Sequence, residues 1–188
     1  MPTIRDSGTT LEGPSKPELV FGIAGAMGVD LAAIRDSLAT ALRAVRYETE
    51  MIHLTTEMLE YNVPNKPPKP SDNSFYLDVL YKIKYANALC EEFKDAATLA
   101  RIAMRAIATR REGLTDDRQR PSASTAYIIR QLKRPAEVAL LRRVYGKQFV
   151  LVSAYGSAEQ RQTCWKSTSG VRWCLRPPAM RLRPKLLS

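Results

Sequence analysis

The sequence predicts a three-layer α/β fold, in which helices cover both faces of a mostly parallel sheet of about four strands. Short apolar segments alternate with amphipathic helical segments, as they do in βαβ units. Two such strand–helix–strand units occur, one starting at residue 18 and one at residue 126. The 188 residues leave room for one domain with a hydrophobic core, and a second full-sized domain would not fit.

The first unit begins with a strand predicted at residues 18–24 (ELVFGIA), an apolar run with β-branched and aromatic members. A helix is predicted next, because apolar residues recur at steps of three and four: Leu31, Ile34, Leu38, Leu42 and Val45. Residues 47–54 (YETEMIHL) are predicted as the second strand, at a spacing that suits a βαβ crossover.

Between the two units, residues 62–73 contain four prolines and are predicted to form a loop. Residues 74–112 have a helical pattern throughout, which predicts a helical insertion with a break near residues 91–95. Gly113 and the polar residues after it are predicted to end this helical region.

The second unit consists of a strand at residues 126–132, a helix and a strand at residues 148–156. Pro135 and Glu137 suit the first turn of the helix, and Gly146 suits the position just after its end. This gives one domain at residues 18–161.

The ends of the chain differ from this domain. Residues 1–17 are rich in Ser, Thr, Gly and Pro, which predicts a flexible segment. Residues 162–188 form a basic, irregular tail with six basic and no acidic residues, so the net charge of +10 leaves only +4 for the preceding 161 residues. The small net charge of the domain therefore gives no reason to predict a nucleic-acid-binding surface on it.

The segment GIAGAMGVDLAA, residues 22–33, follows the first strand and opens the first helix, as a phosphate-binding loop does. Its glycines recur at steps of three, which matches neither GxGxxG nor GxxxxGK[ST]. Asp30, Leu31 and Ala32 stand where the second pattern has Gly, Lys and Ser or Thr. The candidate phosphate contacts are the backbone groups of Gly22, Gly25, Ala26, Met27, Gly28, Val29 and Asp30.

Asp30 is also a suitable N-cap, and its carboxylate would then compete with a phosphate for the same helix amides. A triphosphate would need Mg²⁺ to bridge it to Asp30, or would have to sit toward residues 25–28. The alternative is that the glycines only let the first helix pack close to the strand. Arg130, Lys133 and Arg134, together with Arg161, could supply positive charge, although a solvated basic face would explain them equally well.

Two stretches together resemble the N-terminal domain of the anti-phage dCTP deaminases. They are FGIAGAMGVDLAAIRDSLATALRAVRYETEMIHL, residues 21–54, and AYIIRQLKRPAEVALLRRVYGKQFVLVSAYGSAEQRQ, residues 126–162. In those proteins a P-loop, nucleotide-kinase-like domain precedes a zinc-dependent deaminase domain. The resemblance implies a P-loop NTPase-like fold and a sensing or regulatory role in a defence that depletes deoxycytidine nucleotides. The glycine loop of that family also lacks an ordinary GK[ST].

The deaminase half of that family has no counterpart in this chain. Zinc deamination needs an H-x-E and a P-C-x-x-C arrangement, whereas His53 is followed by Leu54 and Thr55 and the three cysteines form no C-x-x-C. We therefore expect no zinc in this chain. His53 is interpreted as a packed, neutral side chain of a buried strand, and Cys164 and Cys174 as uninvolved, since their spacing matches no common zinc site.

Three functions follow from these observations. The preferred one is a nucleotide-binding, kinase-like regulatory domain without chemistry of its own, with a deaminase domain or further copies of itself as partners. The second is an active P-loop kinase, which the missing lysine disfavours. The third is a nucleic-acid-binding module that uses the tail and its residues Trp165 and Trp173.

The tail has two interpretations, a natural basic extension or a segment read out of frame in a truncated gene. The N-terminus lacks the basic start and apolar stretch of a secretory signal, and no apolar run is long enough to span a membrane. Three cysteines, an odd number, suit a reducing compartment better than a disulfide framework. A cytoplasmic protein is therefore expected.

Overall fold

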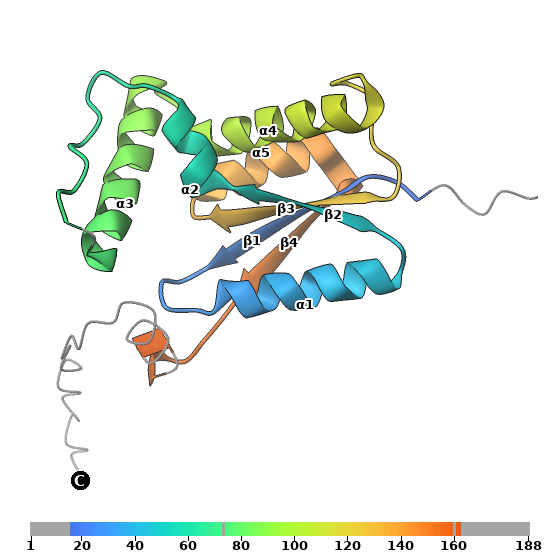
Figure 1. Ribbon diagram of the computed structural model, residues 1–188, viewed down its shortest axis with the longest axis horizontal. Helices are drawn as coiled ribbons and strands as arrows, with labels where there is room; N and C mark the ends of the chain where they lie inside the picture. The colour runs from blue at the N-terminus through green and yellow to red at the C-terminus, as the bar shows by residue number, and fades with distance from the viewer. Residues whose placement is uncertain (1–15, 73, 160, 163–188) are drawn as a thin grey trace, which may run out of the picture.

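The computed structural model describes residues 16–72, 74–159 and 161–162, and at its centre is an all-parallel sheet of four strands (Figure 1). The strands are β1 (Leu19–Gly25), β2 (Glu48–His53), β3 (Thr125–Leu132) and β4 (Phe149–Ala154), in the order β2-β3-β1-β4. The predicted α/β class and number of strands are confirmed.

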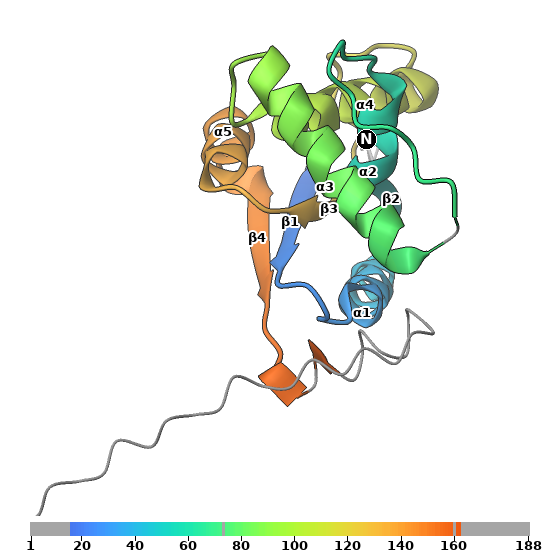
Figure 2. The ribbon, with the colours of Figure 1, turned by 90° about the vertical axis from the view of Figure 1, so that its left-hand side faces the viewer.

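Helices cover both faces of this sheet, and Figures 1 and 2 show α1 on one face with α4 and α5 on the other. The α-helices are α1 (Leu31–Ala44), α2 (Leu54–Glu57), α3 (Phe75–Glu92), α4 (Thr98–Thr115) and α5 (Pro135–Tyr145). Two single 3₁₀ turns, η1 (Met58–Glu60) and η2 (Gly146–Gln148), follow α2 and α5. The result is the predicted three-layer arrangement.

Each face of the sheet has its own core, because successive strand residues point to opposite faces. In β1, Val20 packs toward α4 and α5, and Phe21 packs toward α1. The same alternation holds in β3 for Tyr127 and Ile128. All four side chains are buried.

The predicted boundaries hold with local exceptions. The proline-rich loop contains no helix or strand in its described part, and the helical break falls between α3 and α4. The prediction that Gly113 ends the helix is wrong, because α4 continues to Thr115 and ends at Asp116, whose φ of 57° is left-handed. The short helix α2 was not predicted from the sequence.

The chain path makes the connections that follow β1 and β3 diverge. From β1 the chain passes through α1 and over β3 to reach β2, and from β3 it passes through α5 and over β1 to reach β4. The two connections leave adjacent strands in opposite directions and on opposite faces (Figure 1). In open α/β sheets, ligands bind outside the carboxyl ends of the strands at such a point.

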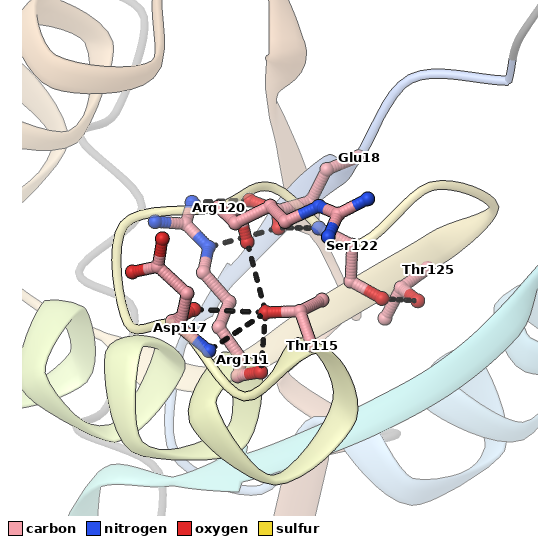
Figure 3. A network of polar contacts seen from close by, with 7 residues as sticks. All are labelled: Glu18, Arg111, Thr115, Asp117, Arg120, Ser122 and Thr125. Atoms are coloured by element: carbon pink, nitrogen blue, oxygen red, sulfur yellow. Dashed lines mark hydrogen bonds and ion pairs between the residues drawn. The ribbon is translucent and has the colours of Figure 1, made fainter.

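At the opposite, amino end of the sheet, a polar network joins the start of β1 to the end of α4 and to the segment before β3 (Figure 3). The buried carboxylate of Glu18 is ion-paired with Arg111 and also accepts a hydrogen bond from the Ser122 amide at 3.0 Å. Thr115 Oγ1 donates to the carbonyl oxygen of Arg111 at 2.9 Å. The polar contacts at this end of the sheet therefore hold β1, α4 and the segment before β3 together.

Predictions about both ends of the chain fall largely outside the described residues. Of the segment 1–17 only Lys16 and Pro17 are described, and the Lys16 carbonyl accepts a hydrogen bond from the Ser124 amide at 2.9 Å. Of the tail, only Gln162 is described, so Trp165, Trp173 and both tail cysteines lie beyond it. Within the described part of the chain, none of the helices has the length and apolar character needed to cross a membrane.

Candidate functional site

The glycine loop lies at the carboxyl end of β1, with residues 26–30 between β1 and α1. Gly28 has a φ of +82°, which is unfavourable for residues that carry a Cβ. A Cβ on Gly28 would also lie 2.4 Å from the carbonyl oxygen of Arg161, which packs against the loop from the segment after β4. Gly28 is therefore required both by its backbone conformation and by this close approach.

Asp30 is the N-cap of α1, as predicted. Its Oδ1 accepts hydrogen bonds from the amides of Ala32 at 3.1 Å and Ala33 at 3.0 Å. Within the described residues, the amides of Met27, Gly28 and Asp30 have no hydrogen-bond acceptor. The amides that remain for an anion are thus those of the loop, and the first turn of α1 is already capped.

A cavity of about 430 Å³ opens beside this loop, at the carboxyl ends of β1, β2 and β3. Its polar side is formed by loop residues 27–30 together with His53, Arg130 and Lys133. Its apolar side comes from α2, η1 and α3, with these side chains: Leu54, Met58, Phe75, Val79 and Ile83. The cavity combines a polar end, which contains Gly28 and basic side chains, with a mostly apolar wall that also carries Asp78 and Lys82 of α3. Its volume is within the range of small-molecule sites.

Arg130, near the carboxyl end of β3, is the arginine that lines the cavity. Its Nε is buried and has no hydrogen-bond partner among the described residues. The register of β3 against β1 shifts between Ile23 and Ala24, so Arg130 precedes a bulge, a feature that often redirects side chains beside binding sites. Burial lowers the pKa of Arg130, and the charge of Arg35 lowers it further.

Lys133 also lines the cavity, and Arg134 does not. The Lys133 amine donates to the carbonyl oxygen of Gly25 at 2.5 Å, although the two residues are 108 positions apart. Arg134 instead donates through Nη2 to the side-chain oxygen of Asn87 in α3 at 2.7 Å. Of the predicted basic contacts, Arg130 and Lys133 line the cavity beside the loop, whereas Arg134 is bound to α3 and lies outside the lining.

Some of the other predicted loop residues line the cavity, and the rest do not. Met27, Val29 and Asp30 line the cavity together with Gly28. Gly22 lies inside β1, where an added Cβ would meet Leu132 at 2.5 Å, and it serves packing. Gly25 and Ala26 connect β1 to the loop and lie outside the cavity lining.

The interpretation of His53 as a packed residue inside a buried strand is wrong. His53 is the last residue of the edge strand β2, is half-buried and lines the cavity. Burial lowers its pKa, and the charges of Arg130 and Arg35 act in the same direction. The imidazole is therefore neutral at pH 7 but faces the same space as the basic residues.

Sequence reasoning missed the apolar wall of the cavity. In α3 the lining residues Phe75, Val79, Ile83 and Ala86 follow a helical spacing, a signal that the sequence does contain. That signal was hidden because Tyr85 and Leu89 form a second, buried face on the same helix. Which of the two faces lines a cavity depends on how α3 packs, and spacing alone does not specify it.

Comparison with known proteins gives no family model that matches the chain and no significant match among curated proteins.

Proposed function

We propose that this chain is a nucleotide-binding, P-loop kinase-like domain that senses a nucleotide and does not turn it over. The observation that carries the proposal is the position of the cavity, at the point where the connections of β1 and β3 diverge and directly beside the glycine loop. Phosphates would meet the loop amides and Arg130, and the nucleoside would lie toward the apolar wall.

The regulatory part of the proposal rests on the composition of the loop. Leu31 stands where a P-loop would have its lysine, and its side chain is 2 % exposed and packed in the core under α1. The first turn of α1 is therefore not arranged to stabilise charge during phosphoryl transfer. The resemblance to anti-phage dCTP deaminases supports a role in which such binding controls a deaminase partner.

Calorimetric titration tests nucleotide binding directly. Purified chain is titrated with dCTP, dCMP and ATP, each with and without Mg²⁺, and with deoxycytidine as a ligand that has no phosphate. We expect at least one phosphorylated ligand to bind more tightly than deoxycytidine. The proposal is wrong if none of the three phosphorylated ligands binds.

An active kinase is the second candidate, because Lys133 brings an amine to the glycine loop from another strand. Incubation with ATP and dCMP, followed by chromatographic separation of the nucleotides, distinguishes the two functions. A sensor leaves both compounds unchanged under conditions where calorimetry shows binding. Formation of ADP and dCDP in equal amounts would establish the kinase.

A further inference from the structure

Lys133 lies at the glycine loop with unused hydrogen-bonding capacity. An ammonium group has three N–H donors, and within the described residues the only acceptor of the Lys133 ammonium group is the Gly25 carbonyl oxygen. No carboxylate of the described residues lies within ion-pair distance of it, whereas Lys82, the other lysine of the cavity, is paired with Asp78 at 2.7 Å. Lys133 is thus the cavity lysine whose charge is not neutralised by a side-chain partner.

Glu137 fixes the turn that carries Lys133 by accepting hydrogen bonds from its main chain. This side chain is 0 % exposed, and its Oε2 accepts hydrogen bonds from the Lys133 amide at 2.8 Å and the Arg134 amide at 3.1 Å. Arg134 is tied in turn to Asn87 of α3. The backbone at Lys133 is therefore fixed, while the long side chain above it can change its acceptor.

We propose that Lys133 is the cation that binds the terminal phosphate at this site, in place of the lysine that the loop lacks, and that Glu137 positions it. The proposal rests on the proposed function. In the free protein the amine is bound to the Gly25 carbonyl oxygen, and a phosphate beside the loop offers it a charged acceptor and a stronger hydrogen bond. Binding then transfers the amine from the main chain to the ligand.

Three substitutions test the role of Lys133. We measure the affinities of Lys133→Met, Lys133→Arg and the control Lys147→Met for ATP, dCTP and pyrophosphate by calorimetry. Lys147 serves as the control because it lies in η2 and outside the cavity lining. Because hydrogen bonds to charged groups are worth about 1.5–3 kcal/mol, Lys133→Met should weaken phosphate binding by about 10- to 100-fold. Lys133→Arg should recover part of that loss, and Lys147→Met should change the affinity by less than about threefold, because its charge is exposed to solvent and lies outside the cavity.

Chemical modification of the unaltered chain gives a test that does not depend on any variant folding. Lysines are acetylated with and without saturating pyrophosphate, and the modified sites are quantified by mass spectrometry. Pyrophosphate should protect Lys133 and leave Lys147, which is exposed and outside the cavity lining, unprotected. Equal modification of Lys133 in both samples would overturn the proposal.

The role of Glu137 is tested through Lys133. If Glu137 acts by positioning that lysine, Glu137→Gln should weaken pyrophosphate binding in the wild-type background and have little further effect in a Lys133→Met background. Equal losses in both backgrounds would show that Glu137 only supports the fold.

The two proposals fail in different ways. If the wild-type chain binds ATP or dCTP and Lys133→Met binds them equally well, the inference about Lys133 is wrong and the nucleotide-binding function stands. If the wild-type chain binds none of the phosphorylated ligands, the proposed function itself is wrong.

Discussion

At the scale of single residues, Gly28 is the position where the loop tolerates least change. Its φ of +82° costs a residue with a Cβ about 1–2 kcal/mol. The Arg161 backbone also occupies the space that the new Cβ would take. We expect Gly28→Ala to lower the free energy of unfolding by about 1–3 kcal/mol and to abolish nucleotide binding. Urea denaturation and calorimetry measure the two effects.

Gly113 provides the matched control. It lies in α4, and an added Cβ would have no heavy atom within 4 Å. Gly113→Ala should therefore stabilise the protein by about 0.5–1 kcal/mol and leave binding unchanged. If both alanine variants were equally stable and bound nucleotide equally, the close approach of Arg161 to Gly28 would be incorrect.

His53 should make stability depend on pH. Its pKa in the folded protein lies below the ordinary value of 6.5, mainly because of burial, so the unfolded chain binds the proton more readily. Well above pH 6.5 both states are neutral at this residue and it has no effect. As the pH falls from 6.5 through the lowered pKa, the unfolded state takes up more protons and stability decreases.

Urea midpoints measured between pH 7.5 and pH 5 test this expectation. His53→Gln should lose less stability over that range than the wild-type chain, since glutamine does not titrate. Phosphate binding should oppose the effect, because an anion in the cavity favours the charged imidazole. Identical pH profiles for the two proteins would show that His53 does not carry the dependence.

At the scale of elements, much of the fold could be predicted from the sequence because local signals coincide with tertiary contacts. Asp30 caps α1 through its own carboxylate, and Pro135 starts α5 at a position where a missing amide costs nothing. The continuous apolar run of β1 was equally informative, because Val20 and Phe21 face different cores and both faces of the strand are covered. Such features are encoded within a few residues.

The site was less predictable because it is formed by residues far apart in the chain. The contact between Lys133 and Gly25 depends on β3 lying directly beside β1, which is set by the strand order β2-β3-β1-β4. The sequence predicts parallel strands but not this order. His53 was misjudged for a related reason, because the strand that ends there is an edge strand whose last residue lines the cavity.

The elements at the amino end of the sheet depend on the buried ion pair of Glu18 and Arg111, shown in Figure 3. Arg111→Met would leave the Glu18 carboxylate, which is 4 % exposed, without its charged partner. We expect a loss of about 3–5 kcal/mol in the free energy of unfolding. The matched control is Arg118→Met, whose pairing with Glu112 is exposed and should cost less than about 1 kcal/mol.

Denaturation curves for these two variants give the comparison. Similar small losses would mean that Arg111 does not neutralise a buried charge. Nucleotide binding should be unchanged in both variants under native conditions, because this ion pair lies at the end of the sheet opposite to the cavity.

At the scale of the whole molecule, one sheet connects two cores that share no residue. The core toward α1 contains Leu42, and the core toward α4 and α5 contains Ile107. Since every strand contributes to both faces, neither core can be lost while the sheet remains intact. The described part of the chain should therefore unfold as one cooperative unit.

Leu42→Ala and Ile107→Ala test this cooperativity from the two sides. Both side chains are buried, so each substitution should cost about 2–5 kcal/mol. In urea, each variant should show a single transition, with the same midpoint by circular dichroism and by tyrosine fluorescence.

Because the two sites lie on opposite faces of the sheet, the costs should add in the double variant. Typical domains are stable by only about 5–15 kcal/mol, so the double variant should be close to unfolding at 25 °C. Two separate transitions in either single variant would show that the cores unfold independently.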